Sequence, residues 1–454
     1  MSKLVANRNH ASGGLEDNFE LDFDYPATGS RRRRAATVVA AVWLSTWILH
    51  GVSWGIWAGF GLAAVFGLHT VRLLFAPAPE APPPLSEDTP AMGYPLISLV
   101  VAAKNEESVI TSLVRNLDAL DYPSDRLELW VVDDNSEDRT LSMLKALSSA
   151  YPQLHVHSRP LGAQGGKSGA LNDVLPLTRG ELLGVFDADA QIPATLLRAV
   201  VPLFNRSAVG AVQVRKSITN ADCNVLTQGQ QAEMVLDAFM QQQRIATGGL
   251  GELRGNGQFV RRQALMACGG WNELTITDDL DLTFRLHLNR WDIDLLQVPA
   301  VQEEGVTRPL ALWHQRNRWA EGGYQRYLDY WPMLARNELG RAKTFDMLMF
   351  YLTQYLLPTA AIPDMILSWS RNQLPLLMPV TSLAIALSFF GTWVGLQQTY
   401  ERERREARRF SLIAQSLQAT VYLCHWFVVV SSVTLRMAVR PKRLKWVKTQ
   451  RVGA

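Results

Sequence analysis

The chain has 454 residues, 48% of them hydrophobic, and its 45 Lys and Arg residues nearly balance 42 Asp and Glu residues, for a net charge of +3. No basic stretch is interleaved with aromatic residues, so we expect no nucleic-acid partner. The three cysteines are far apart and match neither a zinc site nor a disulfide framework, which favours a reduced domain facing the cytosol. Apolar residues are concentrated toward the two ends of the chain, and the middle has the pattern of a soluble domain.

The N-terminal region predicts a tail followed by a membrane hairpin. Residues 1–34 are expected to form a disordered tail that ends in four consecutive arginines. The apolar stretch 35–76 is interrupted near its middle, and because one span needs about 20 apolar residues, it predicts two transmembrane helices. Arginine favours the cytoplasmic side of a membrane, which places both ends of this hairpin in the cytoplasm. Residues 77–95 are rich in proline and predict an extended linker.

Residues 96–330 alternate between strand and helix patterns. Helical spacing of apolar residues is found in several segments, and Asn135 or Ser136 can cap the second of the predicted helices. This alternation predicts an α/β domain with a mainly parallel sheet that binds ligands at the carboxyl ends of its strands. The apolar runs of strand length are 96–103, 127–132, 154–157, 182–186 and 209–214, and the segments with helical spacing are 109–120, 141–147, 171–177 and 194–204.

The C-terminal region predicts further membrane helices. Residues 331–344 form a connection to the apolar region 345–439, in which 345–369 and 374–396 are each long enough to cross. The stretch 410–439 is too short for two spans, and one crossing would place the basic tail 440–454 outside. We therefore favour a re-entrant or surface-lying segment there, with a single crossing as the alternative. The prediction is an integral multi-pass membrane protein with four spans and a cytoplasmic catalytic domain.

Acidic residues follow two of the predicted strands. Asp133 and Asp134 can accept hydrogen bonds from a uracil N3–H and from ribose hydroxyls, although a helix-capping turn explains them equally well. Asn105 and Glu106 follow the first strand in the equivalent place. Because the ends of neighbouring parallel strands meet at one sheet edge, we expect all four to face one crevice.

Two further motifs are suited to a diphosphate. Lys167 lies in a glycine-rich turn that resembles a phosphate cradle but lacks the spacing of a nucleoside triphosphatase loop, and an isolated turn of this kind is more often structural. Asp187 and Asp189 follow the strand 182–186, and Mg²⁺ is commonly held by one or two carboxylates together with substrate phosphates. A solvated turn is the alternative for this Asp-x-Asp triplet.

The last two motifs lie on predicted helices. Asp278 and Asp279 begin a helix, where an anion is stabilised and can also act as a general base toward an incoming hydroxyl. Gln315, Arg318 and Trp319 share one face of a later helix, where the arginine can neutralise a leaving diphosphate and the tryptophan can line an acceptor pocket. An amphipathic helix lying on the membrane is the alternative for this segment.

These motifs, in this order, resemble the signature set of the family 2 glycosyltransferases over residues 96–330. The resemblance implies a GT-A nucleotide-sugar-binding fold, a divalent metal and inversion of the anomeric centre. Many members have Thr-Glu-Asp where this chain has Thr-Asp-Asp, so the choice of Asp279 over Asp278 as the base rests on position alone. The resemblance assigns the nucleotide to Asp133 and Asp134, the metal diphosphate to Asp187 and Asp189, the base to Asp279, and the donor and acceptor ends to Gln315, Arg318 and Trp319. The residue patterns described above add Asn105, Glu106 and Lys167 as candidates for binding the nucleotide sugar, and Asp278 and Arg318 as catalytic candidates beside Asp279.

A closer resemblance is to the cyanobacterial members of this family that glucosylate diacylglycerol. It is carried by residues 251–259, 277–285 and 313–324 and by both membrane ends. It implies transfer of glucose from UDP-glucose to the free hydroxyl of diacylglycerol. We also predict Mg²⁺ as the metal, a lipid bilayer as a partner, and an acceptor site near Asn256 and Trp319. The alternatives are a processive polysaccharide synthase, which shares the Gln-x-x-Arg-Trp motif, and a non-catalytic scaffold that kept the fold.

Overall fold

The computed structural model describes residues 30–77, 79–86, 93–404, 406 and 408–440. The predictions of a disordered N-terminal tail and of a basic C-terminal tail therefore lie almost entirely outside the described residues. Residues 79–86 of the predicted linker have no helix or strand, in agreement with the extended form expected from their prolines.

The described part of the chain contains a seven-stranded sheet with the order β3-β2-β1-β4-β6-β5-β7. Strand β6 is antiparallel to both of its neighbours, and all other pairs are parallel, so the predicted mainly parallel sheet is confirmed. Strands β6 and β7 were not predicted, because β6 is only four residues long and β7 carries polar residues at both ends. The strands are β1 (Ile97–Ala103), β2 (Leu127–Asp133), β3 (Leu154–Ser158), β4 (Leu182–Phe186), β5 (Val209–Ile218), β6 (Gln258–Arg261) and β7 (Asp292–Glu303).

Helices cover both faces of this sheet. Along β1, Leu99 and Val101 belong to one apolar cluster and Val100 to the other, as the twofold alternation of a strand requires. Burial on both faces explains why the central strands read as continuous apolar runs. The first cluster includes α3 (Ile110–Asp118), α4 (Thr140–Ala150) and α6 (Leu196–Val200), and the second includes α5 (Gly166–Val174), α8 (Arg262–Cys268) and α9 (Asp278–Leu288).

The predicted cap of α4 is wrong. The helix begins at Thr140, so neither Asn135 nor Ser136 is its N-cap residue. Asp138 instead accepts a hydrogen bond from the Thr140 backbone N–H at 2.9 Å, close to the helix start. Asn135 has a left-handed φ of 56°, which turns the chain away from β2 before the helix begins.

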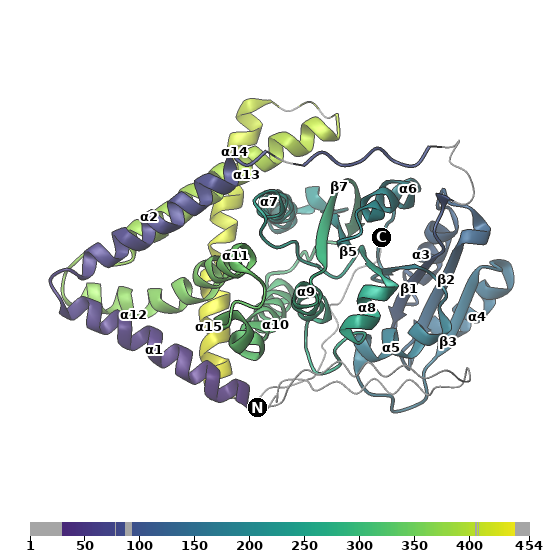
Figure 1. The fold of residues 1–454 in the computed structure, drawn as a ribbon, viewed down its shortest axis with the longest axis horizontal. Helices are drawn as coiled ribbons and strands as arrows, with labels where there is room; N and C mark the ends of the chain where they lie inside the picture. The colour runs from purple at the N-terminus through teal and green to yellow at the C-terminus, as the bar shows by residue number, and fades with distance from the viewer. Residues whose placement is uncertain (1–29, 78, 87–92, 405, 407, 441–454) are drawn as a thin grey trace.

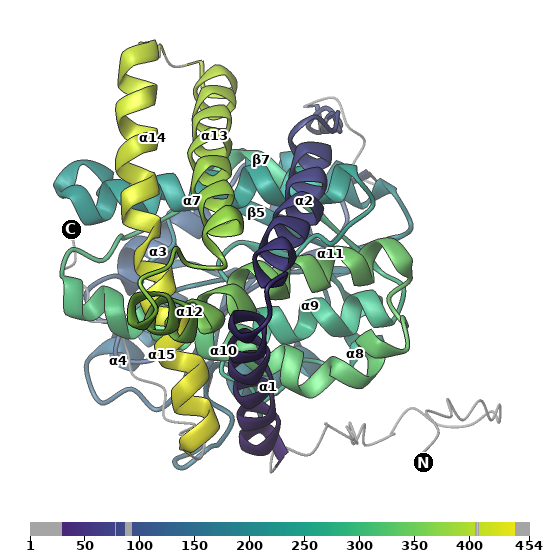
Figure 2. The ribbon, with the colours of Figure 1, turned by 90° about the vertical axis from the view of Figure 1, so that its left-hand side faces the viewer.

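The apolar helices lie to one side of the sheet (Figure 1). These helices form two packed pairs, α1 with α12 and α2 with α13. Two turns, one between α1 and α2 and one between α12 and α13, connect the first pair to the second, and the pairs diverge from these turns (Figure 1). Helices α14 and α15 follow one another across the open side (Figure 2). The remaining long helices, α7 and α10, connect this region to the sheet. Their bounds are α1 (Arg31–Gly51), α2 (Gly55–Leu74), α7 (Val225–Ala246), α10 (Pro309–Ala335), α11 (Arg341–Tyr351), α12 (Leu357–Ser370), α13 (Met378–Arg402), α14 (Arg409–Leu423) and α15 (His425–Val439).

Three helices among the described residues are long and apolar enough to cross a membrane: Gly55–Leu74, Met378–Arg402 and the combined run Arg409–Val439. The first two coincide with predicted spans. The other two predicted spans form α1 and the helical run from α11 to α12, which are not among these three. The third run has 31 residues, is roughly 46 Å long, and has a length that suits the single crossing kept as the alternative. The re-entrant or surface-lying form stays a prediction.

The start of α1 is anchored to the sheet-containing domain. Arg31 is buried and its Nε donates to Asp329 of α10 at 2.8 Å, and Arg34 donates to the Leu328 carbonyl at 2.7 Å. The first turn of α1 is therefore held against α10, and the side of a membrane on which the arginine cluster lies stays a prediction.

Candidate active site

One cavity of about 970 Å³ runs from the carboxyl ends of the strands to the apolar helices. Loops after β1, β2 and β4 contribute to one end of it, as expected for a parallel sheet. Most of the residues predicted for the site line this cavity: Glu106, Asp134, Lys167, Asp187, Asp278, Asp279, Gln315, Arg318 and Trp319. The others predicted, Asn105, Asp133, Asp189 and Asn256, are not among the residues that line it.

Asn105 and Asp133 shape the loops after β1 and β2. The backbone N–H of Asn105 donates to Ser136 Oγ at 2.9 Å, and its side-chain oxygen accepts from the Glu137 N–H at 2.7 Å. Asp133 is 1% exposed and accepts from the Ser136 N–H at 3.4 Å. These bonds join the two loops, so that Glu106 and Asp134 come to one edge of the cavity.

Arg159 organises this edge although sequence reasoning missed it. Its guanidinium donates to Asp134 at 2.7 Å, to Asp173 at 2.7 Å and to the Gln164 carbonyl at 2.6 Å. Arg159 thereby connects Asp134 to Gln164, at the start of the glycine-rich turn. An isolated arginine after a short strand carries no motif, so the sequence offered no signal for it.

The glycine-rich turn needs its glycines. Gly165 has a φ of 85°, and a Cβ there would lie 2.2 Å from a carboxylate oxygen of Glu273. The turn opens α5 and aims Lys167 at Asp187, to which its Nζ donates at 2.7 Å. Burial alone would lower the pKa of Lys167, but the carboxylates of Asp187 and Asp278 raise it, so this amine stays charged.

Asp187 fits a divalent cation. Its side chain is 35% exposed toward the cavity, and Asp189 lies two residues further on. The described residues contain no group of three or more His, Cys, Asp or Glu side chains that could hold a metal alone. One or two carboxylates are sufficient when substrate phosphates and water complete the coordination, which is the usual arrangement for Mg²⁺.

Asn256 supports Asp187 from behind. Its side-chain oxygen accepts from the Asp187 N–H at 3.3 Å, its amide donates to Glu303 at 3.3 Å, and the residue is 1% exposed. The structure thus places Asn256 next to the backbone of Asp187, and its predicted contact with the acceptor stays a prediction.

Asp278 and Asp279 are the first residues of α9, as predicted. Burial and the neighbouring Asp278 carboxylate raise the pKa of Asp279 to about 6. Burial also raises the pKa of Asp278, against the opposing charge of Lys167. Gly255, which lies next to Asp279, has a left-handed φ of 80°, so a side chain there would strain the backbone. A carboxylate with a pKa near neutrality is suited to general-base work.

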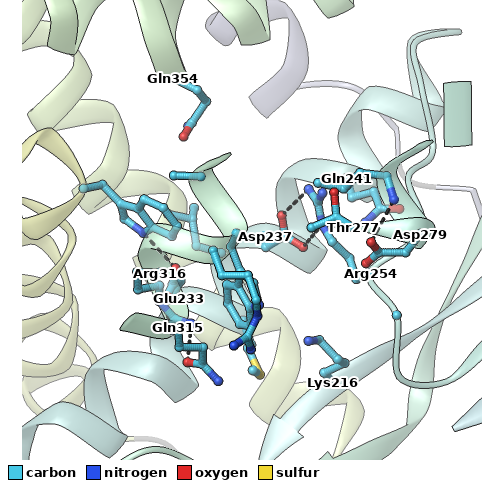
Figure 3. Close-up of a pocket in the computed structure, with 18 of the residues that line it drawn as sticks. Lys216, Glu233, Asp237, Gln241, Arg254, Thr277, Asp279, Gln315, Arg316 and Gln354 are labelled. Atoms are coloured by element: carbon cyan, nitrogen blue, oxygen red, sulfur yellow. Dashed lines mark hydrogen bonds and ion pairs between the residues drawn. The ribbon is translucent and has the colours of Figure 1, made fainter. Parts of the chain in front are cut away.

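The Trp319 ring contacts two cations, one from its own helix α10 and one from β5. The guanidinium of Arg316 is 4.1 Å from the ring centroid and the ammonium of Lys216 is 5.2 Å from it. Arg316 is 1% exposed and donates to Glu233 of α7 at 2.5 Å, and Glu233 also accepts from Trp426 at 2.8 Å (Figure 3). The sequence did not single out Arg316. It lies within the Gln-x-x-Arg-Trp motif, but not on the helix face predicted for Gln315, Arg318 and Trp319.

Comparisons with known proteins agree with this geometry. Residues 95–322 match the profile of the family described as "Glycosyltransferase like family 2". The chain belongs to glycosyltransferase family 2. It is a glycosyltransferase with a GT-A-like fold.

Two curated relatives extend over nearly the whole chain. A beta-monoglucosyldiacylglycerol synthase of Trichormus variabilis is 56% identical over 93% of this chain and 90% of its own length. A protein of the same name from Synechocystis sp. is 53% identical over 96% of this chain and 91% of its own length.

A solved structure supports the fold. The mannosyltransferase PcManGT of Pyrobaculum calidifontis, in complex with GDP-Man and Mn²⁺, matches with a TM-score of 0.52 at 22% identity. The match covers 84% of this chain and 98% of that one. Because the identity is low, the likeness concerns the fold alone.

Proposed function

We propose that this glycosyltransferase transfers glucose from UDP-glucose to diacylglycerol with inversion and forms β-monoglucosyldiacylglycerol. The names of the two relatives above support this substrate pair. The observation that carries the proposal is the single cavity that joins the carboxylates of the sheet edge to the apolar helices. A polar sugar nucleotide and an apolar acceptor can meet in such a space.

The proposed reaction is one displacement at C1 of glucose. Asp279 takes the proton of the free glycerol hydroxyl, whose oxygen forms the new bond to C1 on the face opposite UDP. The bond from C1 to the diphosphate oxygen breaks, and UDP leaves with the electron pair. Arg318 and Lys167 line the same cavity and offset the charge that develops on the diphosphate.

Asp187 and Asp189 are the proposed ligands of the divalent metal, with Mg²⁺ as the expected ion. The metal, when bound, would neutralise charge on the diphosphate. Lys167, which pairs with Asp187 at 2.7 Å, would add a second positive charge for the diphosphate.

Metal removal provides a first test of this assignment. We expect EDTA to abolish glucosyl transfer and Mg²⁺ or Mn²⁺ to restore it. Asp187→Asn should raise the Mg²⁺ concentration needed for half-maximal activity by about tenfold or more, the effect of losing roughly 1.4 kcal/mol of binding. A metal titration that is the same for Asp187→Asn and the parent enzyme would contradict the assignment.

The pH dependence of the reaction provides a second test. Asp279 must be ionised to accept a proton, and its pKa is about 6. Activity should therefore be constant above neutrality and fall about tenfold for each pH unit below 6. The measurement is kcat/KM for diacylglycerol between pH 4.5 and 8, with circular dichroism at each pH to show that the protein stays folded. A flat profile down to pH 4.5 would count against Asp279 as the base.

The chain is proposed to be an integral membrane protein with its catalytic domain in the cytoplasm. Support comes from the three long apolar helices and from the arginine cluster at the sheet domain, where Arg31 contacts Asp329. An engineered cysteine on the catalytic domain should react with a membrane-impermeant maleimide only after cells are opened. Labelling in intact cells would contradict this orientation.

Substrate screening tests the donor and the acceptor together. Purified protein should consume UDP-glucose in preference to UDP-galactose and UDP-N-acetylglucosamine, and only when diacylglycerol is present. Equal use of the three donors would contradict the donor assignment. A product that grows by repeated sugar addition would indicate the polysaccharide synthase alternative, which neither named relative supports.

A further inference from the structure

The end of the cavity away from the sheet is an apolar arm. It lies between the two helix pairs that diverge in Figure 1, with α15 along its side. Phe66 and Leu73 of α2 and Leu387 of α13 line it from one pair, and Leu357 lines it from the other. Phe427 of α15 closes part of the remaining wall. A space of this composition is suited to hydrocarbon chains.

The charged side chains that border this arm neutralise one another. Arg244 donates to Asp346 at 2.8 Å and pairs with Glu252 at 3.2 Å, and Arg326 pairs with Glu252 at 3.4 Å. Each of these cations has a carboxylate oxygen within 3.4 Å, so the arm favours a neutral lipid over an anionic one.

One polar side chain interrupts the apolar wall. Gln354 lies in the π-helical turn Leu352–Leu356 between α11 and α12, a distortion that often marks functional positions. Its amide lines the cavity and points into it, apart from the Arg316 and Glu233 cluster (Figure 3). Within the described residues no hydrogen bond is recorded for this amide, whereas the hydroxyl of its neighbour Thr353 bonds back to the Met349 carbonyl at 3.0 Å.

We propose that this arm binds the two acyl chains of the lipid acceptor and that Gln354 donates a hydrogen bond to an ester carbonyl. The inference rests on the proposed function, because it places the acceptor of that reaction. It assigns the acyl chains to the space between the helix pairs and the glycerol to the boundary with Trp319. The free hydroxyl then faces Asp279, which lines the same cavity.

The chain offers a matched pair of variants for the acyl chains. Leu387 lines the arm, whereas Ile385, two residues away on α13, is 44% exposed and does not. Leu387→Trp should raise the KM for dioleoylglycerol by about tenfold or more, because the added ring fills the space for the chains. The KM for dihexanoylglycerol and for UDP-glucose should change little. Ile385→Trp should leave all three constants unchanged.

The ester contact has its own variant. Gln354→Leu keeps the volume but cannot donate, so the KM should rise about fivefold to tenfold for both chain lengths. A dialkylglycerol, which has ether oxygens in place of ester carbonyls, should bind the parent enzyme more weakly than dioleoylglycerol. In Gln354→Leu this difference should disappear. If the difference persists, or if both tryptophan variants have equal effects, the proposal is overturned.

Photolabelling separates this inference from the proposed function. Diacylglycerol with a diazirine on one acyl chain should label peptides from residues 349–358, 384–388 or 423–430 without any UDP-glucose, and diazirine phosphatidylglycerol should label them less. Labelling there without glucosyl transfer would support the site while the proposed function fails. Glucosyl transfer with labelling confined to other segments would overturn the site and leave the function intact.

Discussion

Asp279→Asn should lower kcat by about 10²- to 10⁴-fold, the usual effect of removing a general base, while the KM for UDP-glucose changes little. The reason is that an asparagine amide cannot take the proton of the acceptor hydroxyl, yet keeps the side-chain volume at the start of α9. The measurement is transfer of labelled glucose to diacylglycerol at pH 7.5. Full activity in this variant would remove Asp279 from its proposed role.

The same substitution should stabilise the fold. The pKa of Asp279 is raised to about 6 by burial and by Asp278. The folded state therefore binds a proton at this position more tightly than the unfolded state, and the ionised form costs stability at neutral pH. A neutral asparagine removes this cost, so the melting temperature should rise as activity falls. A loss of activity with a lower melting temperature would instead indicate that the variant is simply damaged.

Two comparison variants make this result specific. Asp278→Asn distinguishes the two carboxylates. Burial raises the pKa of Asp278 and Lys167 lowers it, and Asp187, a proposed metal ligand, also raises it. This substitution should affect UDP-glucose binding more than the proton-transfer step. Asp292→Asn removes an acid that pairs with Lys343 outside the cavity and should leave both activity and stability nearly unchanged.

Glu252→Gln should destabilise the protein by about 3–5 kcal/mol, because it leaves buried arginines without their counter-charge. Glu252 has no exposed surface and pairs with three guanidinium groups, those of Arg244, Arg254 and Arg326. Burial by itself would raise the pKa of the Glu252 carboxyl. The charges of the three arginines outweigh this effect and hold the pKa well below its usual range. Its contribution to stability is therefore present at neutral pH and is lost only in strong acid.

Denaturation of the purified protein, followed by tryptophan fluorescence, measures this loss. Glu338→Gln is the matched control, since Glu338 pairs with Arg336 at 3.3 Å on the exposed surface. It should cost less than about 1 kcal/mol. Equal stability of the two variants would contradict a structural role for the buried network. Because Arg244 also binds Asp346, the network joins the loop 247–257, which contains Glu252, to α11.

Residues with local signals could be predicted from the sequence. Asp187 follows a buried apolar strand and Asp279 opens an amphipathic helix, so the apolar patterns alone place them at the sheet edge and the helix start. The parallel part of the sheet could be derived for the same reason. Strand β6 could not, since four residues carry too little periodicity to be distinguished from a loop.

Residues that act through distant contacts could not be predicted. Arg159 joins Asp134 and Asp173, and Arg316 joins α10 to Glu233 of α7, 83 residues away. These pairings depend on the tertiary fold, and nothing near either arginine distinguishes it from a surface charge. The prediction for the N-cap of α4 failed for a similar reason. The Ser136 hydroxyl accepts a hydrogen bond from the Asn105 N–H on a neighbouring loop and not from α4.

The structure of the product tests the central claim most directly. Purified protein with labelled UDP-glucose, diacylglycerol and Mg²⁺ should yield one lipid product, whose mass corresponds to a single added hexose and whose anomeric proton shows a β linkage by NMR. An α linkage would contradict the single displacement at C1. A product with several sugars, or no lipid product at all, would contradict glucosyl transfer to diacylglycerol.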